Sequence, residues 1–350
     1  MTGAWRKGAG ALLTGLVPVV LALAFSTLTL LVMGASPLRA YGSMVFGAFG
    51  STAKFTDTVM AWVPLALCAA GLLLTFTAGL WNIGIEGQIV VGAICTTWAA
   101  RAWQEVLPRP VLLLALLLAG MAGGGLWGLL IGALKTYGKV HEIFVGLGLN
   151  FVAVATTNFL IFGPWRTPGR ATMSGTALFE RQAWLPTFPG QAVGPVELVL
   201  VAVSLAVVYA LLRGTRWGLS LKAMGRNPTA AHWLGVPIHR YTLMAFAGCG
   251  LFGGLAGAVQ TLGLFHRLIP AISSGYGYLA ILVVMLSGYR AVGVAPVAFF
   301  FAAITKGSLQ LPLELQLDSA LGGVLQGVLV LFVLLFQGVR ARRKRWAQGE

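Results

Sequence analysis

Long apolar runs separated by short polar connections extend along the whole chain of 350 residues. An α-helix needs about 20 consecutive apolar residues to cross the hydrocarbon core of a bilayer. About ten such runs occur, and several are short enough to be broken or re-entrant helices. The candidate spans are approximately 11–33, 58–78, 83–100, 111–134, 143–163, 195–213, 241–262, 272–288, 292–306 and 319–339. The pattern predicts an all-α fold, a polytopic transmembrane helical bundle.

The composition agrees with a membrane protein and leaves no room for a soluble domain of useful size. Hydrophobic residues make up 58% of the chain, charged residues 9%, and the mean hydropathy is +0.86. A soluble domain usually carries about 25% charged residues. We therefore expect one transmembrane domain over residues 1–350. The apolar stretch from Ala11 to Met33 is too long for the hydrophobic part of a signal peptide, which predicts a retained first helix.

The placement of basic residues predicts the orientation in the membrane. Lysine and arginine gather in alternate connections and in a C-terminal cluster that begins at Arg340, whereas most acids, Glu197 among them, lie in the other connections. By the positive-inside rule both termini are cytoplasmic, 164–194 is the largest external loop, and 213–240 is a cytoplasmic segment. Because the bases lie at the ends of spans, the net charge of +15 does not indicate nucleic-acid binding.

No arrangement of side chains in the sequence indicates an enzyme or a metal site. Cys68, Cys95 and Cys249 lie in apolar runs without paired spacing, and the four histidines lie at loop edges. The P-loop pattern GxxxxGK[ST] does not occur, so the chain does not carry this nucleotide-binding motif. We expect neither a cofactor nor a metal in this chain.

Two glycine-rich runs, 123–128 and 248–253, match GxGxxG but lack the preceding strand that a nucleotide-binding fingerprint needs. Small residues four positions apart let membrane helices pack closely. We therefore predict packing faces, formed by Gly124, Gly128 and Gly132 and by Gly250 and Gly254.

Glu86 is the acidic residue placed deepest between apolar segments, in the run Trp81–Gln88. A carboxylate near the bilayer centre costs roughly 2.5–3.5 kcal/mol on insertion scales, so a functional role is favoured. Asn82, Gln88 and the flanking glycines form a polar break around it. We predict that these side chains line a solute path or its gate. The structural alternative is that Glu86 accepts hydrogen bonds from backbone N–H groups of an interrupted helix.

A second run resembles this one. Residues 82–95 (NIGIEGQIVVGAIC) and 274–287 (SGYGYLAILVVMLS) share a glycine-spaced start and an apolar continuation. Transporters are often built from duplicated halves with the solute site at their interface. The similarity suggests an internal repeat, with chance as the competing explanation.

The polar segment 213–240 predicts a short helix from about 228 to 234. Asn227 can cap the free N–H groups, Pro228 suits the first turn, and Gly235 ends the helix. Small Ala230 and Ala231 lie beside bulky residues, a surface that fits a groove on a partner. An amphipathic helix resting on the membrane surface is the equal alternative.

These motifs resemble one family of transport proteins. The run NIGIEGQ at 82–88, GRNPTAAHWLGVPI at 225–238 and GYGYLAILVVMLSGYRAVGV at 275–294 look like motifs of the permeases of ATP-binding-cassette (ABC) importers for sugars, nucleosides and branched-chain amino acids. Residues 139–165 look most like the longer permease subunit of nucleoside-type importers. The resemblance covers roughly 55–335. One departure is Leu279 after Tyr278, where family members often have Asp after an aromatic residue.

The resemblance implies a permease in the inner membrane that works with other subunits. These are a second permease subunit, identical or different, a cytoplasmic subunit that binds ATP, and an external solute-binding lipoprotein. It implies a solute pathway and a coupling surface for the ATPase. The pathway candidates are Asn82, Glu86, Gln88, Tyr278 and, more weakly, Asn150 and Asn158; the coupling candidates are Arg226, Asn227, Ala230, Ala231 and Gly235.

The expected solute is a nucleoside, with a simple sugar or a branched-chain amino acid as the alternative. An ion-coupled secondary transporter is a different class, and it usually needs more than one buried ionisable group. Besides Glu86, the apolar segments offer only Lys306, which can lie at the end of a span. A scaffold protein would leave the polar cluster at Glu86 unexplained.

Overall fold

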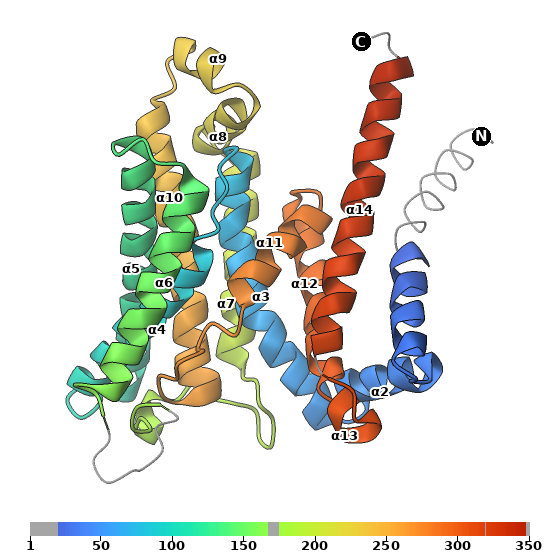
Figure 1. Cartoon of the computed structure of the whole chain (residues 1–350). Coiled ribbons are helices and arrows are strands. Elements are labelled where there is room, and N and C mark those ends of the chain that lie inside the picture. Colours follow the sequence, from blue (N-terminus) through green and yellow to red (C-terminus); the bar gives the residue numbers. More distant parts are fainter. Residues whose placement is uncertain (1–19, 167–174, 319, 348–350) are drawn as a thin grey trace. The chain divides into compact units, whose positions relative to one another are not determined.

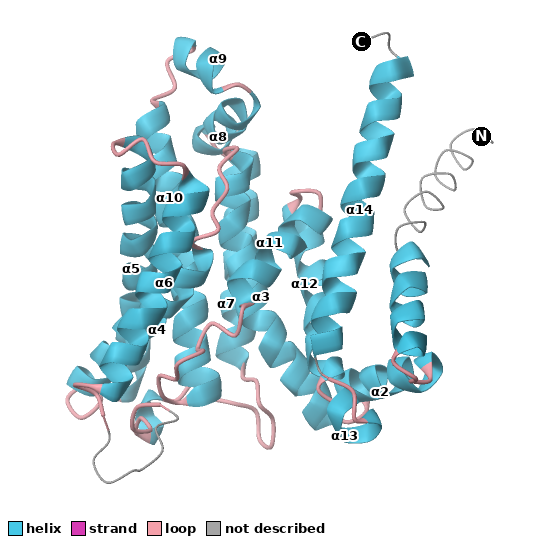
Figure 2. Cartoon of the chain, in the orientation of Figure 1, coloured by secondary structure: helices cyan, strands magenta, loops and turns pink. Residues whose placement is uncertain are grey.

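The computed structural model describes residues 20–166, 175–318 and 320–347, and within these ranges all regular structure is helical (Figure 2). The all-α prediction is therefore confirmed. The first described helix is Val20–Val32. The helices that follow are α2 Pro37–Phe49, α3 Thr52–Thr77, α4 Ile85–Trp103, α5 Arg109–Thr136, α6 Glu142–Phe162, η1 Arg181–Ala183, α7 Pro195–Gly214, α8 Arg216–Arg226, α9 Pro228–Trp233, α10 Ile238–Val259, η2 Gln260–Phe265, α11 Tyr276–Leu286, α12 Ala291–Ser308, α13 Leu311–Leu315 and α14 Ala320–Ala347.

Six of the described helical segments are long and apolar enough to cross a membrane, and a seventh span results if the bent pair Val20–Val32 and Pro37–Phe49 counts as one. Every predicted run coincides with a helix, although residues 11–19 lie outside the described ranges. The runs at 83–100, 272–288 and 319–339 correspond to α4, α11 and α14, which are not among the six. A multi-pass helical membrane protein is thus confirmed, while the count of ten spans stays a prediction.

The described residues divide into two compact units, 59–299 and the combination of residues up to 58 with those from 300 onward. In the larger unit, α4, α5 and α10 pack against one another, and α8 and α9 follow α7 at one end (Figure 1). A Cβ atom added at Gly124 would lie 2.5 Å from the Gly254 Cα, and one added at Gly250 would lie 2.8 Å from the Gly124 carbonyl carbon. The predicted glycine faces therefore do bring these helix backbones together, and GxGxxG here is a packing pattern.

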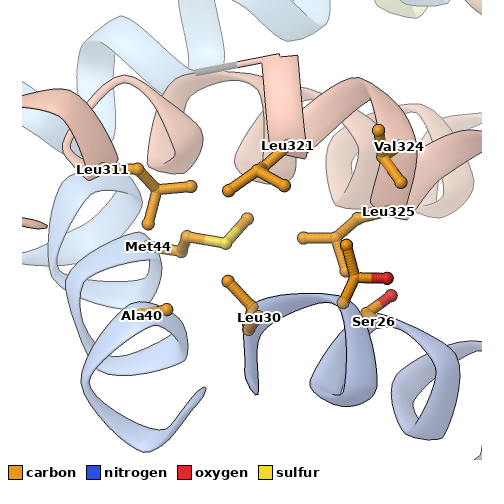
Figure 3. A pocket seen from close by; sticks show the side chains of 9 residues that line it. Ser26, Leu30, Ala40, Met44, Leu311, Leu321, Val324 and Leu325 are labelled. Carbon is orange, nitrogen blue, oxygen red and sulfur yellow. The ribbon is translucent and has the colours of Figure 1, made fainter. Parts of the chain in front are cut away.

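A small cavity lies in the smaller unit, lined by residues of α2, α13, α14 and the helix Val20–Val32 (Figure 3). Its volume is about 10 Å³, and Leu30, Met44, Leu311 and Leu321 point into it. A cavity of about 10–15 Å³ holds at most one water molecule. This space is a gap in apolar packing and is far too small for a sugar or a nucleoside.

Candidate functional site

The polar break predicted around Glu86 is an irregular segment, residues 78–84, that joins α3 to α4. Gly79 has φ of +73°, a left-handed conformation that favours glycine. The helix resumes at Ile85, so Glu86 and Gly87 lie in its first turn, where backbone N–H groups have no partner within the helix. The side chain of the N-cap residue, Gly84, offers no acceptor, and the cap must come from elsewhere.

Asn150 on α6 supplies that cap. Its Oδ1 accepts a hydrogen bond from the Gly87 N–H at 2.8 Å, and its Nδ2 donates to the Ile83 carbonyl oxygen at 3.1 Å. An amide both donates and accepts, so one side chain satisfies the Ile83 carbonyl group in the irregular segment and an N–H group in the first turn of α4. A Cβ at Gly87 would lie 2.8 Å from the same Oδ1, which explains glycine at this position.

Glu86 binds the start of a different helix. The Gly277 N–H, in the first turn of α11, donates to Glu86 Oε2 at 2.8 Å, and Glu86 is only 6% exposed. Ser274 and Gly275 just before this turn have φ of 49° and 73°, which turns successive N–H groups toward one point. Other groups around the carboxylate are the Ser273 side chain and the backbone N–H groups of Gly275 and Tyr278.

This arrangement places a negative charge at the positive end of the α11 dipole, the position where a carboxylate is most stabilised. The geometry matches the structural alternative stated for Glu86, a carboxylate that accepts bonds from an interrupted helix. Gly277 allows the approach, since a Cβ there would lie 2.8 Å from both the N and the Cα of Glu86.

Tyr278 completes a ring of contacts between α4, α6 and α11. The Asn150 Nδ2 donates to the Tyr278 hydroxyl oxygen at 3.3 Å. Asn150 therefore contacts the starts of both α4 and α11, the two half-helices of this site. The Tyr278 side chain is 44% exposed, in contrast to the buried groups behind it. It is the one aromatic residue among the six predicted pathway residues.

Asn82 and Gln88 are fully buried. The Asn82 Nδ2 donates to Gln88 Oε1 at 3.3 Å and to the Cys249 Sγ at 3.1 Å, which ties the irregular segment to α10. Three buried polar atoms here have no hydrogen-bond partner among the described residues: Asn82 Oδ1, Gln88 Nε2 and Trp127 Nε1. Trp127, on α5, was not predicted from the sequence, where it reads as one more apolar residue of a span.

Asn158 lies eight residues beyond Asn150 on α6, about 12 Å further along the helix at 1.5 Å per residue. Its Oδ1 is buried and has no hydrogen-bond partner within the described residues. The structure therefore brings five of the six predicted pathway residues together and leaves Asn158 apart from them.

Two further buried acids were missed. Glu142, at the start of α6, forms an ion pair with Lys135 at 2.5 Å and accepts a long bond from the Trp81 N–H at 3.5 Å. Glu197, expected in an external connection, is the third residue of α7 and is fully buried, and neither carboxylate oxygen has a hydrogen-bond partner among the described residues. Its position three residues after the N-cap, where a Glu can reach back to the first free N–H, was the available signal.

The described part of the long polar stretch before α7 folds back onto η2 and the residues that follow it. The N–H groups of Thr176, Phe179 and Leu185 donate to the carbonyl oxygens of Leu268, His266 and Leu262 at 2.9, 2.9 and 3.2 Å. The His266 ring stacks on Trp184 at 3.8 Å, and burial lowers the pKa of this imidazole below its usual value. The described part of this loop thus covers the π-helix η2.

The predicted short helix in 213–240 is confirmed as α9. The Asn227 side chain accepts a bond from the Ala230 N–H at 3.0 Å, and Gly235 has φ of +84° just after the helix. The orientation differs from the expected docking face. Ala231 is 1% exposed and points into the segment, whereas Trp233 and Leu234 are 83% and 80% exposed.

The family model described as "Branched-chain amino acid transport system / permease component" matches residues 55–334 of this chain. The match covers most of the chain, and it includes the irregular segment, both half-helices and α8–α9. The chain belongs to this permease family.

Several curated relatives are similar over most of their length. The guanosine ABC transporter permease protein NupP of Bacillus subtilis is 28% identical over 334 residues, which is 94% of each chain. The glucose ABC transporter permease protein TsgB13 of Haloferax volcanii is 31% identical over 92% of this chain and 86% of its own. The nucleoside ABC transporter permease protein NupB of Lactococcus lactis is 24% identical, over 85% and 83%.

Proposed function

We propose that this permease is the membrane-spanning subunit of an ABC importer for nucleosides. The observation that carries the proposal is the similarity to the guanosine permease NupP over 94% of both chains. An exposed aromatic ring at Tyr278, with the Asn150 amide behind it, suits a solute that combines a planar base with hydroxyl groups. A sugar is the second candidate, supported by the glucose permease relative.

Uptake by cells tests the solute class. Cells that lack the gene and cells that carry it are given radiolabelled guanosine, glucose or leucine, and purified binding protein from the neighbouring genes is titrated with the same three solutes. We expect gene-dependent uptake and binding for guanosine. Glucose or leucine uptake with no guanosine uptake would replace the nucleoside by that solute.

The importer is assembled from several proteins. The chain also matches a second permease protein of the guanosine transporter, NupQ, at 26% identity over 249 residues, which supports pairing with a different permease subunit. A separate ATP-binding subunit supplies the energy, and an external lipoprotein delivers the solute. Co-purification with a tagged copy of this chain from the inner membrane tests this composition; recovery of a homodimer alone contradicts it.

About ten spans follow from the lengths of the apolar runs, and cytoplasmic termini follow from the placement of the basic residues. In a cysteine-free variant, single cysteines at Gln182 and at Arg226 test this topology with a membrane-impermeant maleimide. Labelling on intact cells at Gln182 alone agrees with it. Labelling at Arg226 alone reverses the orientation.

The solute passes the face of α11 that carries Tyr278. Glu86 and Asn150 position that face, and Asn82 and Gln88 position the irregular segment behind it. These four residues affect the solute indirectly, by fixing the place of Tyr278. Asn158 lies further along α6, apart from these residues, and lines a separate part of the solute path.

The α8–α9 segment docks on the ATP-binding subunit. Trp233 and Leu234 supply the apolar contact, while Arg226, Asn227, Ala230, Ala231 and Gly235 fix the shape of the segment. Trp233→Ala therefore tests docking better than added bulk at the buried Ala231. We expect lower recovery of the ATP-binding subunit in pull-down, with Trp98→Ala, another exposed tryptophan, as the control. Full recovery and normal hydrolysis with Trp233→Ala contradict docking at this surface.

A further inference from the structure

The end of α8 lies directly against the irregular segment 78–84. A Cβ added at Gly225 would lie 2.2 Å from the carbonyl oxygen of Thr77, the last residue of α3, 3.0 Å from the Gly79 N and 3.1 Å from the Ala78 carbonyl carbon. One added at Gly79 would lie 3.1 Å from the Gly225 Cα. Two backbones touch here with no side chain between them. α9 begins at Pro228, immediately after the Asn227 cap.

The irregular segment is held firmly at its other positions. The Asn82 side chain binds Cys249 on α10, and the Trp81 N–H faces Glu142, which is paired with Lys135. Close-packed groups of this kind transmit displacement because they have little free space to absorb it. A shift applied at Gly79 therefore moves the segment as a whole.

The same segment leads into the first turn of α4, and Glu86 in that turn holds the first turn of α11. A continuous series of contacts thus runs from Gly225, at the end of α8, through Gly79 and Glu86 to Gly277. All of these residues lie in the larger unit.

We propose that the contact between Gly225 and Gly79 transmits movement of the α8–α9 segment to the paired starts of α4 and α11. The inference rests on the proposed function and deepens it, because it names the route by which ATP hydrolysis reaches the solute-facing helix. The absence of side chains at both glycines makes the link short and stiff. Coupling between sites needs an element whose position both sites change, and segment 78–84 is that element.

The test uses the whole transporter, with its partner subunits and binding protein, in cells and in proteoliposomes. In Gly225→Ala the added methyl group separates the two backbones. We expect guanosine uptake to fall about tenfold or more and the solute-stimulated hydrolysis to fall to near the basal rate. The ATP-binding subunit still co-purifies, because its docking surface is unchanged. Gly214→Ala is the control, since a Cβ there has no heavy atom within 4 Å.

If Gly225→Ala does not assemble, a second variant tests transmission through segment 78–84. Glu142→Gln keeps the shape of the side chain but removes the ion pair that supports Trp81, and Glu105→Gln changes an exposed acid as its control. We expect the ratio of stimulated to basal hydrolysis to fall about fivefold for Glu142→Gln alone.

The possible failures are distinguishable. If the wild-type transporter moves glucose and not guanosine, the nucleoside proposal fails, and the hydrolysis ratio still tests the glycine contact with glucose. If Gly225→Ala assembles and keeps wild-type uptake and stimulation, the contact is not the link. If it does not assemble and Glu142→Gln keeps the wild-type ratio, the inference is likewise overturned.

Discussion

The starts of α4 and α11 are alike in backbone and different in chemistry. Both follow an irregular segment, and both have a glycine in the first turn whose N–H is bound by a side chain from another helix. At α4 that group is the neutral amide of Asn150, and at α11 it is the carboxylate of Glu86. In the sequence similarity between 82–95 and 274–287 these two glycines are not aligned, since Gly87 falls opposite Leu279, and the internal repeat stays a prediction.

This difference indicates that the start of α4 is firmly fixed, whereas the position of the start of α11 depends on its contact with α4. Asn150 forms hydrogen bonds with the backbone both before and within the first turn of α4, and α4 is buried along most of its length. A carboxylate only accepts, and it attracts several N–H groups at once. The start of α11, which carries the exposed Tyr278, is therefore held mainly by one charged contact from α4.

Glu86→Ala should give the largest effect. It removes a charge-assisted hydrogen bond and leaves the buried Gly277 N–H unpaired, which costs about 3 kcal/mol. We expect a lower thermal unfolding temperature of the purified complex together with lost uptake, and a smaller loss for Glu86→Gln, which keeps one acceptor. Lost uptake at wild-type stability would instead make Glu86 a group that acts on the solute.

Gly277→Ala attacks the same contact from the side of α11. The added Cβ overlaps the Glu86 backbone, and overpacking of this kind costs about 2 kcal/mol. Gly148→Ala on α6 is the control, since its Cβ has open space and alanine favours a helix by about 0.5–1 kcal/mol. Equal unfolding temperatures for the two variants would show that α11 can move away from α4 without loss.

Asn150→Leu sharpens the comparison from the side of α4. It leaves the Gly87 N–H without its acceptor and the Ile83 carbonyl without its donor, and we expect a loss of about 1.5 kcal/mol in thermal stability. Asn150→Asp retains the acceptor for Gly87 and should lose less. An effect of Asn150→Leu larger than that of Glu86→Ala would reverse the order of dependence proposed for the two half-helices.

Tyr278→Phe should have the smallest effect on stability. The hydrogen bond to Asn150 is long and partly exposed, so its loss costs about 0.5 kcal/mol. The informative measurement is the guanosine concentration at half-maximal uptake, which we expect to rise while stability stays nearly constant. An unchanged value would remove the Tyr278 hydroxyl from solute recognition.

Local signals in the sequence were sufficient to predict the helices and their packing faces. The length of each apolar run predicts a helix, Asn227 and Pro228 predict the start of α9, and the glycines at 124 and 254 predict close packing. Each of these features depends on residues a few positions apart on one helix, where the geometry is regular. The sequence also pointed to Glu86, because a carboxylate in an apolar run is costly to insert and this cost favours a functional role.

The tertiary structure alone decided the partners of these residues. Glu86 meets Gly277, 191 residues away, and Gly79 meets Gly225 across a backbone contact that no spacing rule encodes. The inward direction of Ala231 and the full burial of Glu197 are likewise set by the helices that pack around them. The physical reason is that helix periodicity is a property of the local chain, whereas the choice among polar partners depends on which helix ends the packing brings together.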